Sequence, residues 1–130
     1  MGGGKPLDIT IVDNVATELA KLPHAFIEID YVDKTPAGLI ICFDSFSTFS
    51  CKPLINIHDV IVDKKFRGHN LSQKMIAMVD AIAIKKGCCK LTLEVLEGNT
   101  IAQSTYKKFG FTAYELDPNM GKAIFWHKQY

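Results

Sequence analysis

An amphipathic segment between two strand-like segments constrains the fold of this chain more than any other feature. Apolar residues recur in it at the spacing that places side chains on one face of an α-helix, namely Leu71, Met75, Met78, Val79 and Ile82. Gly87 follows as a typical helix terminator. Residues 54–62 before it and residues 90–96 after it are apolar or alternating, as strands are. This order predicts a sheet on which a helix packs.

Shorter patterns on both sides extend this order. Residues 7–11 alternate like a short strand, and Asp13 or Asn14 is a suitable N-cap for a helix that ends before Pro23. A later helix is predicted between an Asn99 cap and Gly110. Further strands are expected at residues 24–30, 39–46, 111–116 and 122–128. The sequence therefore predicts an α/β domain with a mixed sheet and helices on its faces.

Length and charge limit the class of protein. A chain of 130 residues with 48% apolar residues suits a single domain over residues 1–130, and its net charge of +1 argues against a nucleic-acid partner. The longest apolar run, residues 37–43, is far shorter than the roughly 20 residues of a membrane helix. Residues 1–6 contain no apolar segment of a secretory signal. We therefore expect a cytoplasmic protein with no membrane partner.

The cysteines and histidines do not have the spacing of a metal site. The four cysteines include no CxxC pair, and they are Cys42, Cys51, Cys88 and Cys89. The four histidines do not cluster with them, and they are His24, His58, His69 and His127. We expect no metal, and reduced thiols that pack as small apolar side chains.

The loop before the strongest helix combines cations with a free helix N-terminus. It holds Arg67, which is the single arginine beside fourteen lysines, and it also holds Gly68 and Asn70, which tolerate positive φ. A helix N-terminus with such a loop suits phosphate. The alternative is a solvated basic turn, and this segment alone favours that alternative.

Two motifs together change this interpretation. Residues 67–72, Arg-Gly-His-Asn-Leu-Ser, resemble the RGxGxG/A loop of the GNAT superfamily of acyl-CoA-dependent N-acetyltransferases. Residues 99–111 resemble the NxxAxxxYxKxGF helix of that family, with matches at Asn99, Ala102, Tyr106, Lys108, Gly110 and Phe111. The preceding Leu-Glu-Val of residues 93–95 is similar to the family strand that ends in LEV. Within the family, residues 46–49 and 57–62 most resemble the diamine acetyltransferase group.

The resemblance implies a GNAT-like mixed, mostly antiparallel sheet with helices on both faces. It also implies a shortened N-terminal part. The family usually places a strand and two helices before its second strand, whereas residues 1–23 have room for one short strand and one helix. Because related enzymes are often dimers, a homodimer is expected.

The resemblance also implies a site for acetyl-CoA. The pyrophosphate would lie on the amides of six consecutive residues, Arg67, Gly68, His69, Asn70, Leu71 and Ser72. The pantetheine arm would pair with the backbone of residues 59–62, including Val60, Ile61 and Val62, where this strand and residues 91–96 splay apart. The N–H of Val60 would polarise the thioester carbonyl, and Asn99 would contact the pantetheine. Since Asn70 and Ser72 replace small family residues, we expect weaker coenzyme binding than in a glycine-rich relative.

Two residues are candidates for acid–base catalysis. Tyr106 matches the family tyrosine near the sulfur and would protonate the departing thiolate, the alternative being a core aromatic beside Phe109. His58 stands where the diamine group has a glutamate and would act as base, with a purely structural histidine as the alternative. Strand alternation places His58 with Asn56, Val60 and Val62, and places Ile57, Asp59 and Ile61 on the other face.

These expectations lead to two functional hypotheses. The first is an N-acetyltransferase that moves an acetyl group from acetyl-CoA directly to a primary amine. The resemblance implies a small polyamine-like acceptor, and a peptide N-terminus, a lysine side chain or an aminoglycoside are the alternatives. Several carboxylates could attract such a cation, namely Asp44, Asp59, Glu94 and Glu97. The second is a catalytically weak CoA-binding or protein-interaction module that retains the fold.

Overall fold

The computed structural model describes residues 6–115 and 117–130, and the chain divides into two compact units, Met1–Glu94 and Val95–Tyr130. The helices of the first unit are α1 (Ile9–Ala20), the 3₁₀ helix η1 (Lys64–Phe66) and α2 (Leu71–Lys85). Its strands are β1 (Ala25–Val32), β2 (Thr35–Ser47), β3 (Lys52–Val62) and β4 (Leu91–Leu93). The second unit contains α3 (Thr100–Lys108). The single domain over residues 1–130 stays a prediction.

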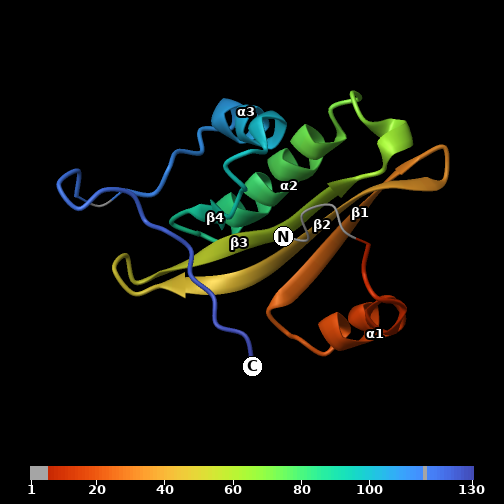
Figure 1. Ribbon diagram of the computed structural model, residues 1–130, viewed down its shortest axis with the longest axis horizontal. Coiled ribbons are helices and arrows are strands. Elements are labelled where there is room, and N and C mark those ends of the chain that lie inside the picture. The colour runs from red at the N-terminus through yellow and green to blue at the C-terminus, as the bar shows by residue number, and fades with distance from the viewer. Residues whose placement is uncertain (1–5, 116) are drawn as a thin grey trace. The chain divides into compact units, whose positions relative to one another are not determined.

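The first unit is built on one mixed sheet. Its four strands lie in the order β1-β2-β3-β4, with antiparallel pairing among the first three strands and parallel pairing between β3 and β4. Figure 1 shows α2 along one side of this sheet and α1 on the other side, next to β1. The predicted mixed, mostly antiparallel sheet with helices on both faces is confirmed. Within the described residues, no helix is both long and apolar enough to span a membrane.

The core lies between α2 and the sheet. The helix buries one stripe of side chains, namely Leu71, Met75, Ile76, Val79 and Ala83. The facing strands bury Ile40, Cys42, Ile55 and Ile57. Three residues of the predicted stripe are therefore confirmed as buried, while Met78 and Ile82 are half-buried. Burial also raises the pKa of the Cys42 thiol to about 12, so this side chain stays protonated and packs as a small apolar group.

The expected strand at residues 7–11 is wrong. Helix α1 already begins at Ile9, because the carboxylate of Asp8 accepts a hydrogen bond from the N–H of Thr10 at 2.9 Å and so caps the helix. The N-cap was expected at Asp13 or Asn14, five or six residues after Asp8. An alternation of only five residues is compatible with a strand or with a helix, and the cap at Asp8 favours the helix. One helix thus precedes β1 within the described residues.

The expected final pair of strands is also not formed within the described residues. Residues 111–115 and 122–128 share one backbone hydrogen bond, from the N–H of Ala123 to the carbonyl of Tyr114 at 3.0 Å. A hairpin needs a buried face to be stable, yet the side chain of Trp126 is 80% exposed. Leu116, the expected end of the first of these strands, and the opening glycines lie outside the described residues.

Candidate active site

Strand β3 carries an extra residue in the middle of its pairing with β2. Ile41 lies opposite Asp59 and Cys42 lies opposite Ile57, which leaves His58 without a partner in the register. Such a bulge interrupts the alternation of side chains between the two faces. The ring of His58 packs edge-on against Phe43 at a centroid distance of 5.3 Å.

The bulge corrects the predicted distribution of side chains on β3. The buried Ile57 lies on the side of α2 together with Val60 and Val62, whose partners Ile40 and Gly38 are also buried. The face of the sheet opposite α2 therefore carries four residues of β3, namely Asn56, His58, Asp59 and Ile61. His58 and Asp59 are consecutive and share this face because of the bulge. Simple alternation across residues 56–62 was wrong because it assumed a regular strand.

Strands β3 and β4 pair over three residues only. The register runs from Ile55 opposite Leu91 to Ile57 opposite Leu93. In the described chain, β3 continues to Val62 with β2 alone as its neighbouring strand. We call the point after the pair Ile57–Leu93 the strand fork. Backbone beyond the fork has an open side on which an extended ligand can pair.

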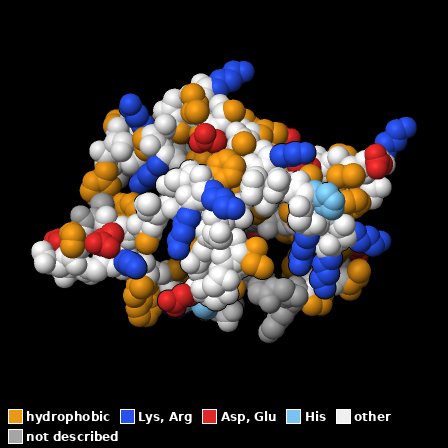
Figure 2. Space-filling view, turned by 90° about the horizontal axis from the view of Figure 1, so that it is seen from above, with side chains coloured by type: hydrophobic (Ala, Val, Ile, Leu, Met, Phe, Trp, Pro, Cys, Tyr) orange, Lys and Arg blue, Asp and Glu red, His pale blue; other side chains and the backbone are white. Residues whose placement is uncertain are grey.

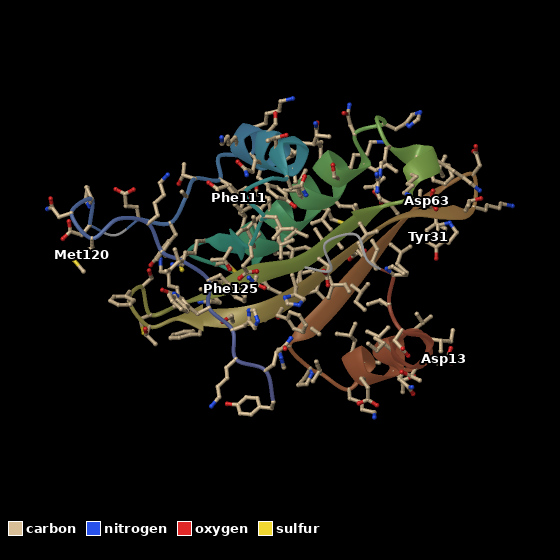
Figure 3. The ribbon with its side chains drawn as sticks, viewed as in Figure 1. Asp13, Tyr31, Asp63, Phe111, Met120 and Phe125 are labelled. Atoms are coloured by element: carbon tan, nitrogen blue, oxygen red, sulfur yellow. The ribbon has the colours of Figure 1, made fainter. Side chains whose placement is uncertain are left out.

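The loop after β3 is held close to the end of the sheet. The N–H of Asp63 donates to the carbonyl of Ala37 at 2.9 Å, and the carboxylate of Asp63 accepts from the N–H of Lys65 at 2.8 Å. Figure 3 shows Asp63 at this end of β3. The guanidinium of Arg67 donates through Nε to the carbonyl of Val62 at 3.2 Å. The side chains of Lys64, Lys65 and Arg67 are exposed. Figure 2 shows several basic side chains gathered around one histidine on this face of the molecule.

Helix α2 begins directly after this loop without a side-chain cap. Gly68 has φ of 83° and Asn70 has φ of 60°, so the chain turns through two left-handed residues into the helix. The side chain of Asn70 makes no capping hydrogen bond. Nδ1 of His69 lies 3.1 Å from the carbonyl of Arg67 and 3.2 Å from that of Phe66, which orients its ring within the loop. The first N–H groups of α2, which include those of Leu71 and Ser72, are therefore left for a ligand or water.

A polar group lies at the strand fork on the face opposite α2. The side-chain amide of Asn56 donates to Oγ1 of Thr92 at 3.1 Å and to Oε1 of Glu94 at 3.5 Å. These three side chains are half-buried. Among the residues that the structure describes, no three His, Cys, Asp or Glu side chains are grouped to hold a metal ion.

The second unit carries the other two predicted site residues. The side chain of Asn99 accepts from the N–H of Ala102 at 3.2 Å and caps α3, as the sequence predicts. The ring of Tyr106 packs against the ring of Phe111 at a centroid distance of 5.9 Å, whereas the alternative interpretation placed it beside Phe109. Desolvation by burial raises the pKa of Tyr106 above its ordinary value, so the phenol keeps its proton through neutral pH.

Most of the predicted site residues lie in the first unit, along the stretch of chain that runs from β3 through the loop into α2. The structure brings together Val60, Ile61 and Val62 at the end of β3, the loop Arg67, Gly68, His69 and Asn70, and the first residues of α2, Leu71 and Ser72. His58 lies at the fork, and Asn99 and Tyr106 lie in the second unit. Sequence reasoning missed the group formed by Asn56, Thr92 and Glu94. A signal was present, since Asn56 interrupts an otherwise apolar half-strand and Thr92 and Glu94 alternate on one face.

This chain belongs to the acetyltransferase (GNAT) family, whose model matches residues 8–111. It is also similar to two enzymes named thialysine N-epsilon-acetyltransferase. The protein from Bos taurus is 34% identical over 73 residues, which make up 56% of this chain and 42% of that protein. The protein from Sus scrofa is 36% identical over 56 residues, 43% of this chain and 33% of that protein. The matched segments thus span less than half the length of these relatives.

Solved structures share the fold over nearly the whole chain. A probable acetyltransferase superposes with a TM-score of 0.83 at 16% identity, covering 98% of this chain and 83% of that one. A structure of AAC(6')-Iy in complex with the bisubstrate analogue CoA-S-monomethyl-acetylneamine gives a TM-score of 0.71 at 23% identity, covering 98% of this chain and 84% of that one. At these identities, the likeness concerns the fold.

Proposed function

We propose that this protein is an N-acetyltransferase that moves the acetyl group of acetyl-CoA directly to a primary amine of a small, polyamine-like acceptor. The observation that carries the proposal is the uncapped N-terminus of α2, which follows the open end of β3 through a basic, left-handed loop. Family membership supports acetyl transfer, and relatives named for acetylation at an Nε atom support an amine acceptor.

The coenzyme is proposed to bind along the backbone from the fork to α2. The pantetheine would pair with β3 at Val60, Ile61 and Val62, and Asn99 would contribute a further contact. The pyrophosphate would accept hydrogen bonds from the amides of residues 67–72, where the positive end of the helix dipole and the exposed lysines favour an anion. AAC(6')-Iy, a structural neighbour, was solved with an analogue that contains CoA, which supports acetyl-CoA as the co-substrate.

The reaction needs one base and one acid. A neutral amine nitrogen attacks the thioester carbonyl carbon, and the oxyanion that forms accepts a hydrogen bond from the N–H of Val60. When the C–S bond breaks, the sulfur takes a proton from the phenol of Tyr106, and the imidazole of His58 receives the proton that the amine loses. The product is an amide, with free CoA thiol. No protein nucleophile takes part.

The raised pKa of Tyr106 predicts how the activity depends on alkaline pH. Because burial disfavours the phenolate, Tyr106 remains an acid up to a pH above about 10, the ordinary value for tyrosine. Activity that depends on this proton is therefore retained at alkaline pH and falls only when the phenol ionises. A fall of activity at lower alkaline pH, unchanged in Tyr106→Phe, would come from another group.

Release of free thiol from acetyl-CoA with a panel of primary amines tests the proposed function. We expect turnover by the wild type, and a loss of about 10²–10⁴-fold in kcat for Tyr106→Phe. Tyr130→Phe is a matched control, because the side chain of Tyr130 is fully exposed. Coenzyme binding without turnover would support the binding-module hypothesis, and equal rates for wild type and Tyr106→Phe at every pH would refute the acid role.

The base is tested separately with His58→Gln. This change keeps a polar side chain at the bulge but removes the imidazole. We expect a slower reaction, because a side-chain amide cannot take up the proton that the amine loses. A variant with the pH profile and rate of the wild type would show that His58 is structural, held by Phe43.

Compartment and assembly are part of the same proposal. The cysteines lack the spacing of a disulfide framework, which supports a reducing compartment such as the cytoplasm. On β1, the exposed Ile27, Ile29 and Tyr31 form an apolar face that a second copy could cover, which supports a homodimer. Light scattering at micromolar concentration would show a mass near twice 14.5 kDa, and a monomer mass would contradict this part of the proposal.

A further inference from the structure

We propose that Glu94 determines acceptor specificity by binding a second, non-reacting ammonium group of a diamine at the strand fork. This inference rests on the proposed function and deepens it, because it assigns the selection of a dication to Glu94, the central residue of the Leu-Glu-Val segment, which precedes the helix motif of residues 99–111. The register of β3 and β4, the contacts of Asn56 and the ion pair of Asp44 support it.

The register brings Glu94 next to the candidate base. Asn56 pairs with Thr92 and Ile57 pairs with Leu93, in parallel strands. The residue that follows this last pair is His58 in β3 and Glu94 directly after the end of β4. The contacts of His58 with Phe43 and of Glu94 with Asn56 put both side chains on the face opposite α2. One face of the fork thus presents an imidazole and a carboxylate together.

Asn56 orients this carboxylate without neutralising it. Its amide nitrogen lies 3.5 Å from Oε1 of Glu94 and 3.1 Å from Oγ1 of Thr92, so it makes one short and one long hydrogen bond. A neutral donor leaves the negative charge in place. Glu94 is half-buried, and a charge that is partly shielded from water attracts a cation more strongly than one on the open surface.

The other carboxylates near the sheet are less suited to this role. Asp44 forms an ion pair with Lys86, with Nζ–O distances of 2.6 and 2.7 Å, so its charge is already balanced. Asp59 shares the face of His58 but lies opposite Ile41, beyond the bulge from Asn56. Glu97 belongs to the second unit.

These positions define the chemical class of the acceptor. One nitrogen of a short aliphatic diamine would reach the thioester beside His58 as a neutral amine. The other would stay protonated and donate to the carboxylate of Glu94. A monoamine of the same length has no group for Glu94 and loses this charge-assisted hydrogen bond. The structure therefore predicts a preference for diamines over matched monoamines.

The test compares 1,4-diaminobutane with butylamine in the thiol-release assay at saturating acetyl-CoA. For Glu94→Gln, which removes the charge and keeps the shape, we expect KM for the diamine to rise about tenfold or more, with kcat nearly unchanged. The kinetics with butylamine should change little. Glu28→Gln is the matched control, because Glu28 lies on β1 opposite Ile40, on the α2 side of the sheet, and should keep the preference.

The outcomes separate this inference from the proposed function. Turnover of both amines by wild type and Glu94→Gln, with the same diamine preference, would overturn the role of Glu94 and leave the enzyme intact. An equal loss of kcat for both amines would also overturn it, because it would mean a structural or catalytic role. Restoration of the preference by Glu94→Asp, with unchanged thermal unfolding, would support it. Absence of turnover by the wild type with every amine would refute both.

Discussion

The N-termini of α2 and α3 are both preceded by an asparagine, but only one of the two asparagines caps its helix with its side chain. Asn99 has negative φ and its side chain accepts a hydrogen bond from the N–H of Ala102 at 3.2 Å. Asn70 has φ of 60°, and its side chain makes no capping hydrogen bond. In α3 a side chain satisfies the helix end, whereas in α2 the backbone shapes the helix end and leaves its N–H groups available.

This difference indicates which helix end suits a ligand. A side-chain cap stabilises a helix by about 1 kcal/mol, so an uncapped end forgoes that stability unless something else binds there. The α2 end is also the one beside Lys64, Lys65 and Arg67, which add positive charge to the end of the helix dipole. Asn99 caps the N-terminus of α3, and α3 carries Tyr106. In the proposed function, the open N-terminus of α2 would bind the coenzyme, and the capped helix α3 would hold Tyr106 in position.

The largest expected effect is a loss of affinity for CoA when a negative charge is introduced at the N-terminus of α2. Ser72→Asp places a carboxylate in the first turn of α2, where it should repel the pyrophosphate and lower the affinity for CoA about tenfold or more. The same carboxylate should raise the free energy of unfolding by about 0.3–1 kcal/mol. Calorimetric titration with CoA and thermal unfolding measure these opposite changes.

Two variants serve as controls for this prediction. Ser72→Asn alters the side chain without adding charge and should keep most of the affinity for CoA. Ile101→Asp adds the same charge at the matching second position of α3, where the side chain is 83% exposed, and should stabilise the helix without weakening CoA binding as Ser72→Asp does. Equal losses of affinity in the two aspartate variants would mean that the two helix ends are not distinct.

The second effect concerns the left-handed conformation at Asn70. A β-branched residue is strained at φ of 60°, so Asn70→Val should lower the free energy of unfolding by about 1–2 kcal/mol. Asn99→Val removes a cap instead and should cost about 1 kcal/mol. Urea unfolding measures both values. A smaller cost at position 70 than at position 99 would contradict the backbone role of Asn70.

The smallest expected effect is the change in the free energy of unfolding when glycine replaces each asparagine, and it should differ between positions 70 and 99. Asn70→Gly relieves a left-handed residue and should leave stability unchanged or slightly higher, while CoA binding should improve or stay the same because a Cβ is removed from the loop. Asn99→Gly loses a side-chain cap and should cost a few tenths of a kcal/mol. The two variants measured side by side by urea unfolding would show the difference. A clear loss of stability in Asn70→Gly would argue that its side chain has a structural contact.

The sequence predicted what depends on neighbouring residues. The cap at Asn99, the positive φ of Asn70 and the burial of Leu71, Met75 and Val79 all follow from local pattern and residue type, and the structure confirms them. The roles of these positions in binding and catalysis stay proposals. The two asparagines could be told apart because Gly68 and the basic loop precede only one of them.

The errors arose where the outcome depends on distant strands or on competing local signals. The extra residue at His58 is set by the register between β2 and β3, although two adjacent polar residues, His58 and Asp59, break the alternation and hint at it. The group of Asn56, Thr92 and Glu94 requires strands that are 36 or more residues apart in the chain. At the N-terminus, Asp8 was overlooked as a cap because the following residues also alternate.

The most direct test of the account is an amide NMR titration of the full chain with CoA. The account predicts that the backbone N–H signals of residues 68–73 shift together and saturate with increasing CoA, while those of residues 9–12 at the Asp8-capped start of α1 stay in place. Saturable binding that leaves residues 68–73 unshifted, or no shift at millimolar CoA, would contradict the claim that the open end of α2 holds the coenzyme.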